Sequence, residues 1–287
     1  MTIKLIKFEI TCKVKLNSGN VNLQTVGRKK RKTQMSKMNL AVGIVGLKSG
    51  TNIKDIEVPD ALRNRRKVNV SWFDDAIGGE GFTPSSVMML TGTPGAGKTT
   101  MMLQMADAIT SAGHVCLYNT GEESLYQVKM VVERLGLEHG FIVGQDEIID
   151  DVLAHAESIR KANPAKQMFL LIDSLQTLDD GKWAAGANSM TAVRVTEALV
   201  NWAKSTHAIV LFIGQVNKDG VFAGKNTILH AVDLKGNIFI DEGKKSETFG
   251  ERIFEITKNR WGCSGRKYIM GMGRTGLYEK GSISTTE

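Results

Sequence analysis

The sequence predicts an α/β protein in which a mostly parallel sheet carries helices on both faces and is extended by an antiparallel edge. Two observations predict this fold. Short apolar runs of five or six residues lack the alternation of a half-buried strand and are separated by helix-like segments, a pattern typical of parallel strands buried on both faces. A glycine-rich loop, residues 92–99, also joins one of these runs to a helix. A small, basic, β-rich arm is expected before this body.

The elements of the body are expected in the following order. Strands are predicted at 87–91, 114–118, 168–172 and 208–213, where the apolar runs are continuous. Helices are predicted at 99–112, 125–135, 148–162 and 191–206. From Asn237 onward the segments are shorter and separated by turns, which favours antiparallel strands added at one edge of the sheet.

The arm has a different pattern. Residues 8–16 and 21–24 alternate apolar and polar side chains around an Asn-Ser-Gly-Asn turn, which predicts a β-hairpin. Residues 39–47 are apolar and compatible with a further strand, and the basic run 63–67 marks the boundary with the body. We therefore predict an arm over 1–67 and an α/β domain over 68–287.

Composition excludes several classes of protein. Hydrophobic residues make up 42% of the 287 residues and charged residues 23%, so a wholly disordered or collagen-like chain is excluded. The longest apolar run is far short of a membrane span, and the N-terminus lacks the apolar core of a secretory signal. No membrane partner is therefore expected. Cys12, Cys116 and Cys263 lie far apart and form neither a disulfide framework nor a zinc motif, which favours the cytoplasm.

Charge is distributed unevenly along the chain. Residues 1–70 hold 16 Lys and Arg against 4 Asp and Glu, a net charge of +12, which leaves −5 for residues 71–287 of a chain with net charge +7. A basic arm on a mildly acidic body is typical of a protein that contacts nucleic acid. A solvated tail accounts for the charge equally well.

The glycine-rich loop matches the phosphate-binding motif G-x-x-x-x-G-K-[ST] at every fixed position, between an apolar strand and a helix. Its glycines let backbone N–H groups surround phosphate oxygens, and the helix N-terminus adds a positive dipole. Lys98 is expected to neutralise the β- and γ-phosphates, and the Thr99 hydroxyl to bind Mg²⁺. The ATP-binding residues predicted from this motif are Gly92, Thr93, Pro94, Gly95, Ala96, Gly97, Lys98, Thr99 and Thr100.

Acidic residues follow two of the other predicted strands. Asp173 ends the run 168–172, where a carboxylate can hold Mg²⁺ across from Thr99; capping of a loop is the alternative. Glu122 and Glu123 follow the strand at 114–118, and carboxyl ends of parallel strands gather ligand chemistry. We predict Glu122 as the general base, with Glu123 as the close alternative, because Glu123 is nearer the start of the next helix. A capping motif, in which Ser124 caps that helix and Glu123 forms a surface salt bridge, is the alternative.

A third loop follows the run 208–213. Gln215 stands at its start, where a side-chain amide can hydrogen-bond the γ-phosphate and report its loss; satisfying the loop backbone is the alternative. Residues 217–226 carry Lys218 and Lys225 and suit contact with a nucleic-acid backbone. A plain solvent loop is the alternative there.

These loops, in this order, resemble the ATPase core of the bacterial RadA family, within the RecA/DnaB/KaiC group of P-loop ATPases. The matching stretches cover about residues 68–280 and are Ile77-Gly78-Gly79, Gly92–Thr99, Gly121-Glu122-Glu123-Ser124, Ile172–Leu178, Gly214–Gly220 and Lys258-Asn259-Arg260-Trp261-Gly262.

The resemblance implies a RecA-type fold, ATP-driven assembly into a ring or filament, and handling of single-stranded DNA. It also implies that Lys258 and Arg260 act in trans on a neighbour's γ-phosphate, which suits their charge. Residues 217–226 would form the second DNA-binding loop and 179–190, with Lys182, the first. An exposed basic turn is the alternative reading of the segment from Lys258 to Arg260.

The sequence departs from the RadA pattern in several places. A four-cysteine zinc module and a Lon-like domain are not expected, Trp261 replaces Phe, and Gln215 stands where His is frequent. These departures favour a reduced, phage-type relative. The function predicted is a ring-forming ATPase, with a hexamer expected and a filament as an alternative, that uses ATP and Mg²⁺ and is stimulated by single-stranded DNA. The alternative is a KaiC-like, nucleotide-switched scaffold without DNA activity.

Overall fold

The computed structural model describes residues 50–182, 189–215 and 226–283. The hairpin predicted at 8–24 and the strand predicted at 39–47 lie outside these residues. The described strands are β1 (Val87–Gly92), β2 (Val115–Thr120), β3 (Ile142–Gly144), β4 (Met168–Asp173), β5 (Ile209–Ile213), β6 (Leu234–Ile240), β7 (Arg252–Asn259), β8 (Lys267–Gly273) and β9 (Gly276–Ile283). The helices are η1 (Ile53–Asp55), α1 (Asp60–Arg63), α2 (Ser71–Ala76), α3 (Lys98–Ser111), α4 (Leu125–Leu135), α5 (Ile149–Ala162), η2 (Leu175–Thr177), α6 (Ser189–Thr206) and α7 (Asn226–Ala231).

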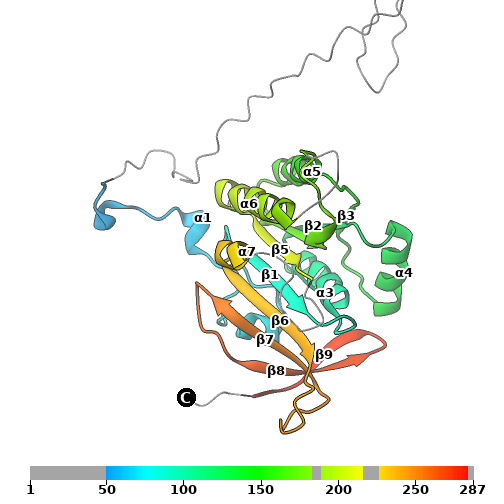
Figure 1. The fold of residues 1–287 in the computed structure, drawn as a ribbon. Coiled ribbons are helices and arrows are strands. Elements are labelled where there is room, and N and C mark those ends of the chain that lie inside the picture. Colours follow the sequence, from blue (N-terminus) through cyan, green and yellow to red (C-terminus); the bar gives the residue numbers. More distant parts are fainter. Residues whose placement is uncertain (1–49, 183–188, 216–225, 284–287) are drawn as a thin grey trace, which may run out of the picture. The chain divides into compact units, whose positions relative to one another are not determined.

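The nine described strands form one sheet in the order β3-β2-β4-β5-β1-β6-β7-β8-β9 (Figure 1). The strands from β3 to β6 pair in parallel, and β7, β8 and β9 continue the sheet antiparallel. The predicted parallel sheet with an antiparallel edge is therefore confirmed. One detail is wrong: β6 starts at Leu234, before the predicted change of pattern at Asn237, and pairs in parallel with β1.

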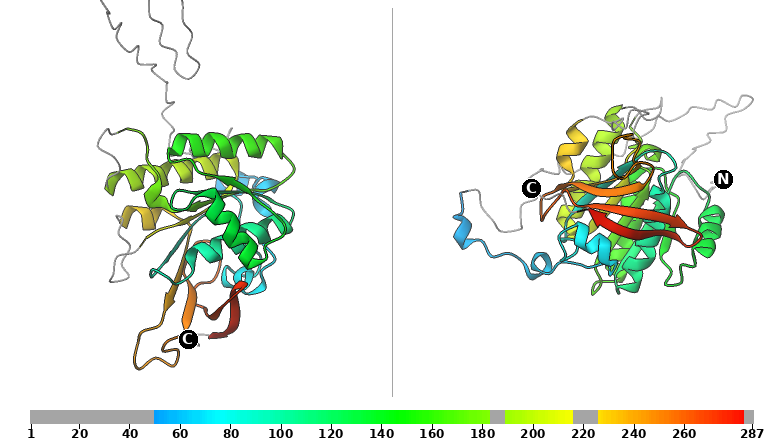
Figure 2. Two further views of the ribbon diagram at one scale, coloured as in Figure 1. Left: turned by 90° about the vertical axis from the view of Figure 1, so that its right-hand side faces the viewer. Right: turned by 90° about the horizontal axis from the view of Figure 1, so that it is seen from below.

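Helices cover both faces of the sheet, as predicted (Figure 2). In β4, Phe169 and Leu171 pack in the cluster that contains α2, α3 and α4, whereas Leu170 and Ile172 pack in the cluster that contains α5, α6 and α7. Successive residues of a strand point to opposite faces, so a continuous apolar run is what a strand covered on both sides requires.

Local sequence fixes where the helices begin and end. Ser124 caps α4 by accepting the N–H of Gln127, and the Gln127 side-chain oxygen in turn accepts the backbone N–H of Ser124. The helix ends at Gly136 in the left-handed conformation. This leaves Glu122 and Glu123 in the turn between β2 and the helix. Gly92 is required at the end of β1, because a Cβ there would lie 1.9 Å from the carbonyl oxygen of Ile238.

The segment before β1 is tied to the sheet domain. Arg66 and Phe82 exchange two backbone hydrogen bonds of 2.8 and 2.9 Å. The buried carboxylate of Asp74 accepts the backbone N–H groups of Val68 and Asn69 at 3.1 and 3.0 Å, and burial raises its pKa. The backbone is therefore anchored at Arg66, within the basic run 63–67, and just after that run. The domain boundary proposed after the run stays a prediction.

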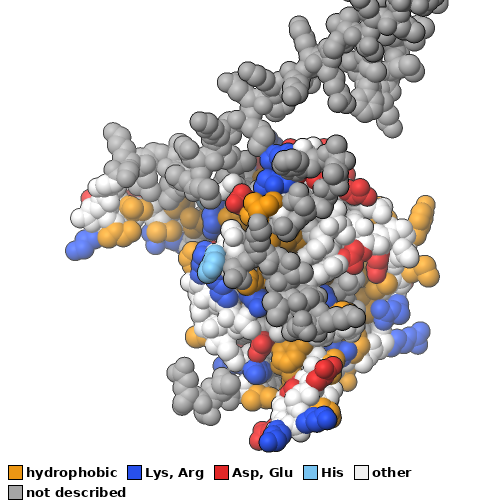
Figure 3. Space-filling view, viewed as in Figure 1, with side chains coloured by type: hydrophobic (Ala, Val, Ile, Leu, Met, Phe, Trp, Pro, Cys, Tyr) orange, Lys and Arg blue, Asp and Glu red, His pale blue; other side chains and the backbone are white. Residues whose placement is uncertain are grey.

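The surface of the described residues carries mixed charge on the projecting connection between β6 and β7, residues 241–251, where cationic and acidic side chains lie close together in the space-filling view (Figure 3).

None of the helices in the described part of the chain combines the length and apolar character that crossing a membrane requires.

Candidate active site

Four neighbouring strands bring the predicted site residues together at their carboxyl ends. Glu122 follows β2, Asp173 ends β4, Gln215 follows β5, and the glycine-rich loop follows β1, and these strands are adjacent in that order. Their carboxyl ends border a cavity of about 540 Å³, the place where open parallel sheets bind ligands. The lining residues are Gly92, Pro94, Gly95, Gly97, Lys98, Thr99, Thr100, Glu122, Asp173, Ile213, Gln215 and Met272.

The glycine-rich loop has the geometry of an anion cradle. Gly95 and Gly97 have φ values of +76° and +99°, which only glycine adopts without strain. The Lys98 ammonium donates to the carbonyl oxygens of Gly92 and Thr93 at 2.9 and 3.0 Å. Burial lowers the pKa of Lys98, and the carboxylates of Asp173 and Glu122 oppose that shift. The loop thus holds its cation against its own carbonyl groups, beside the cavity.

Asp173 and Thr99 are in direct contact at the wall of this cavity. Asp173 is buried and accepts hydrogen bonds from the Thr99 side chain and, at 2.9 Å, from the Tyr118 hydroxyl. Burial raises the pKa of Asp173, and these two hydrogen bonds work against the rise. Hard oxygen donors of this kind suit Mg²⁺, which takes one or two protein oxygens and completes its shell with phosphate and water. Among the described residues there is no cluster of three or more His, Cys, Asp or Glu that holds a metal alone.

Glu122 is joined to two of the neighbouring strand ends. Its Oε1 accepts the Ser174 hydroxyl at 2.6 Å and the Gln215 side-chain amide at 2.8 Å. Glu123 does not line the cavity; its Oε2 is buried with no hydrogen-bond partner among the described residues, and burial raises its pKa. Of the two candidates for general base, the structure places only Glu122 at the cavity.

The antiparallel edge also reaches the glycine-rich loop. Arg252, at the start of β7, donates from Nε to the Ala96 carbonyl oxygen at 2.8 Å. Met272 of β8 lines the cavity, and its Cε would lie 2.7 Å from a Cβ placed on Gly97. Neither contact carries a signal in the sequence, because both depend on how the edge strands fold back over the loop.

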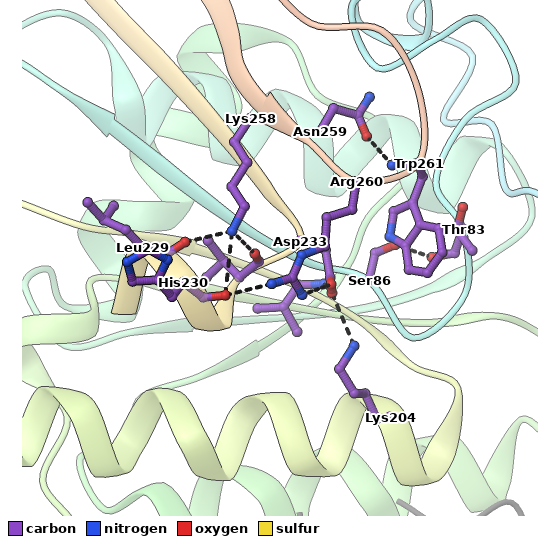
Figure 4. A network of polar contacts seen from close by, with 12 residues as sticks. Thr83, Ser86, Lys204, Leu229, His230, Asp233, Lys258, Asn259, Arg260 and Trp261 are labelled. Atoms are coloured by element: carbon purple, nitrogen blue, oxygen red, sulfur yellow. Dashed lines mark hydrogen bonds and ion pairs between the residues drawn. The ribbon is translucent and has the colours of Figure 1, made fainter. Parts of the chain in front are cut away.

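Lys258 and Arg260 lie elsewhere. The Lys258 ammonium donates to the carbonyl oxygens of Leu229 and Val232, both at 2.7 Å, at the end of α7 (Figure 4). Arg260 forms an ion pair with Asp233 at 3.0 Å and donates to the His230 carbonyl oxygen at 2.8 Å. Neither residue is among those that line the cavity.

The separation follows from the sheet. The Val87 N–H at the start of β1 donates to the Asp233 carboxylate at 3.1 Å, while the glycine-rich loop leaves β1 at Gly92. Five steps along a strand span about 16 Å. The fingers predicted from the resemblance therefore stand at the opposite end of the sheet from the cavity of their own chain.

The predicted DNA-binding lysines are only partly within the structure. Lys218 and Lys225 lie outside the described residues. Lys182 is exposed, and its ammonium lies 3.8 Å from the Asp180 carboxylate. Asp180 also pairs with Arg194, which leaves Lys182 a weak, solvent-exposed ion pair.

Tyr118, Ser174 and Asp233, like Arg252 and Met272, are not predicted from the sequence as residues of the cavity or of the Lys258–Arg260 cluster. Tyr118 resembles any apolar strand residue, and its role follows only from the pairing of β2 with β4, which sets Thr120 opposite Asp173. Ser174 follows Asp173 directly, so its position was a usable signal. Asp233 precedes β6 without any motif, and nothing in the sequence connects it to Arg260.

Comparison with known proteins agrees with this arrangement. The family model for the KaiC ATPase matches residues 67–277. The DNA repair protein RadA of Streptococcus pneumoniae is 34% identical over 243 residues, which are 84% of this chain and 54% of that protein. RadA of Bacillus subtilis is 31% identical over 230 residues, 80% of this chain and 47% of that protein. The chain thus spans about half the length of the curated relatives it matches.

Solved structures share the fold. A KaiC-like protein from Pyrococcus horikoshii matches with a TM-score of 0.59 at 18% identity, covering 75% of this chain and 98% of that one. A DnaB-like replicative helicase matches with a TM-score of 0.64 at 14% identity, covering 80% of this chain and 68% of that one. With the matched family model and the geometry of the phosphate loop, the chain belongs to the KaiC ATPase family and is a P-loop ATPase of the RadA and RecA-like type.

Proposed function

We propose that this ATPase assembles into a ring, with a hexamer expected, in which adjacent protomers share each nucleotide, and that single-stranded DNA stimulates its turnover. One observation carries the shared site. The cavity gathers Lys98, Thr99, Asp173, Glu122 and Gln215, while the two cations suited to the transition state are held at the other end of the sheet. A head-to-tail contact brings one end of a protomer against the other end of its neighbour.

In this proposal the residues of the cavity have separate roles in ATP hydrolysis. Lys98 and the loop N–H groups bind the phosphates, and Glu122 takes a proton from the attacking water, while Gln215, bonded to Glu122, orients that carboxylate. Mg²⁺ would be held by Thr99 and Asp173 and would supply neutralisation of phosphate charge. Lys258 and Arg260 of the adjacent protomer would stabilise charge on the transferred phosphoryl oxygens.

Loss of the lysine charge tests the site assignment. Lys98→Ala is expected to reduce ATP hydrolysis about a hundredfold or more, with an unchanged circular dichroism spectrum. Lys129→Ala, which removes an exposed lysine paired with Glu133 on α4, should retain the wild-type rate. An unaffected rate in Lys98→Ala would remove the assignment.

Contact with DNA is supported by a basic cleft on the described surface. A cavity of about 670 Å³ is lined by residues 63–67, Asn69, Glu80, Ala112 and His114, and thus by four Lys and Arg side chains against one carboxylate. Relatives named for DNA repair, and the structural neighbour named as a DnaB-like replicative helicase, point to the same class of partner.

The proposal also includes the cytoplasmic location expected from the three widely spaced cysteines.

Binding in a salt series tests the DNA partner. Fluorescence anisotropy with labelled single-stranded DNA should give an affinity that falls with salt, and Arg66→Gln/Lys67→Gln should lower the slope by about 0.7 for each phosphate that the variant no longer neutralises. Lys244→Gln/Lys245→Gln on the exposed β6–β7 connection removes the same charge and should leave the slope unchanged. Equal slopes in both double variants would exclude the cleft.

A nucleotide-switched scaffold is the second candidate, and the match to the KaiC family model favours it. The two candidates differ in one readout. A scaffold assembles with nucleotide but hydrolyses ATP at the same rate with and without DNA, whereas the proposed motor is accelerated by it.

A further inference from the structure

A buried carboxylate stands behind Arg260. Asp233 is 1% exposed, and its two carboxylate oxygens have separate partners (Figure 4). Oδ2 accepts the Val87 N–H at 3.1 Å and lies 3.4 Å from the Lys204 ammonium, whereas Oδ1 lies 3.0 Å from Nη1 of Arg260. The backbone is fixed as well, since Asp233 donates its N–H to the Val87 carbonyl oxygen at 2.8 Å. Asp233 is therefore anchored to β1 through one oxygen and offers the other to Arg260.

Arg260 is held at two points and remains accessible. Its Nη1 contacts Asp233, its Nη2 donates to the His230 carbonyl oxygen at 2.8 Å, and its side chain is 47% exposed. A guanidinium has five N–H donors in a rigid plane. Two are used by these contacts, so three remain for an oxyanion presented from outside the chain.

We infer that Asp233 is a positioning residue for Arg260, orienting its guanidinium toward the γ-phosphate bound by the adjacent protomer. This inference rests on the proposed shared site. Asp233 does not touch the nucleotide of its own chain, since it lies at the start of β1, about 16 Å from the glycine-rich loop. It acts by fixing the plane of Arg260, so that little torsional freedom has to be given up when the phosphate arrives.

A purely structural ion pair is the competing explanation, and the chain contains the control that separates the two. Lys204, on α6, pairs with Oδ2 of the same carboxylate. Between the described residues, no hydrogen bond or ion pair joins the Lys204 ammonium to Arg260. If Asp233 serves only to neutralise buried charge, loss of either cation should have similar effects. If Asp233 positions Arg260, only the Oδ1 side matters for turnover.

Steady-state ATP hydrolysis by the assembled protein tests the inference in four variants. Arg260→Ala should lower kcat about a hundredfold or more, and Asp233→Asn should lower it about 10- to 100-fold, with KM and nucleotide affinity unchanged in both. Lys204→Gln should remain within about twofold of wild type, because Oδ1 and Arg260 are untouched. The double variant Asp233→Asn/Arg260→Ala should be no slower than Arg260→Ala alone, because the carboxylate acts through that arginine.

The outcomes distinguish failure of the inference from failure of the shared site. Wild-type kcat in Arg260→Ala would overturn the shared site itself. Two results would overturn the inference alone, provided that Arg260→Ala shows the expected loss of kcat. One is a wild-type kcat in Asp233→Asn. The other is a double variant whose loss of kcat equals the product of the two single losses. If Asp233→Asn does not fold and so cannot bind nucleotide, Arg260→Lys replaces it as the test. A lysine ammonium lacks the planar fork that lets Arg260 contact Asp233, the His230 carbonyl oxygen and a phosphate together. The kcat of Arg260→Lys should therefore fall, and a kcat near the wild-type value would overturn the inference.

Discussion

Tyr118 is a buried residue of a core strand that also serves the proposed metal site. Its hydroxyl donates to Oδ2 of Asp173 at 2.9 Å, and its side chain is fully buried. A hydrogen bond to the charged form of a carboxylate favours that form, so Tyr118 opposes the rise in the pKa of Asp173 that burial causes. The hydroxyl thus keeps a buried acid available for a cation.

Tyr118→Phe is expected to raise the Mg²⁺ concentration for half-maximal hydrolysis several-fold, while the fold and metal-free nucleotide binding stay unchanged. The substitution keeps the ring and removes only the donor. Tyr278→Phe, at an exposed position of β9, is the matched control. A Mg²⁺ titration of the rate that superimposes on wild type would show that the hydroxyl does not support the metal.

Asp173→Asn should abolish Mg²⁺-dependent hydrolysis and raise the unfolding temperature of the nucleotide-free protein near neutral pH. The pKa of Asp173 is raised in the folded state, so the folded protein binds a proton more readily than the unfolded chain. Wild-type stability from this group is therefore greatest at low pH and is lost as pH rises through the folded pKa. Because Asn does not titrate, the difference in Tm between Asp173→Asn and the wild type should narrow as pH falls. Thermal unfolding followed by circular dichroism over a pH series measures this difference. A difference in Tm that does not change with pH would contradict the prediction.

At the scale of residues, the sequence predicts what motifs specify and no more. Lys98, Thr99, Asp173, Glu122 and Gln215 meet at one cavity, because each follows or ends a strand whose parallel course is evident from its apolar run. Tyr118 and Asp233 could not be found in this way. Their partners are set by strand register and by the packing of α7, and neither leaves a pattern in the chain.

At the scale of elements, the antiparallel edge is attached to the helix of the phosphate loop. The Gln104 side chain of α3 accepts the Leu277 N–H at 2.9 Å and donates to the Leu277 carbonyl oxygen at 3.1 Å. This pair of hydrogen bonds fixes the turn between β8 and β9, and with it Met272, which lines the cavity. The edge strands are therefore part of the proposed nucleotide site.

Gln104→Ala should lower the free energy of unfolding by about 1–3 kcal/mol, because two half-buried backbone groups lose their partner. It should also raise KM for ATP more than it lowers kcat, since the catalytic side chains stay in place. Urea unfolding and steady-state kinetics measure the two effects. Lys129→Ala on α4 is the control, with a change below about 0.5 kcal/mol; an unchanged KM in Gln104→Ala would separate the edge from the site.

Elements that bury a continuous apolar run can be predicted to within a residue or two, as for β4, which is predicted at 168–172 and observed at Met168–Asp173. Short or exposed elements cannot. β3 has three residues, of which Ile142 and Val143 are exposed, and α2 and α7 have six each. Such elements are too short for periodicity to appear and owe their structure to tertiary contacts.

For the whole molecule, the two ends of the sheet have complementary chemistry. One end holds the phosphate loop, the acids and Gln215, and the other presents Lys258 and Arg260 on a support built from α7 and Asp233. A surface that differs between the two ends of a protomer generates rings or filaments by head-to-tail contact. The sequence predicts this arrangement only through its resemblance to a family, because in the proposed assembly no single chain contains the completed site.

Mixing two inactive variants tests the shared site most directly. Lys98→Ala protomers keep Arg260 but lack a working cavity, and Arg260→Ala protomers keep the cavity but lack the finger. In an equimolar mixture, about a quarter of the head-to-tail contacts pair an intact cavity with an intact finger, so hydrolysis should recover to a matching fraction of the wild-type rate. A mixture no more active than its two components would contradict the shared site.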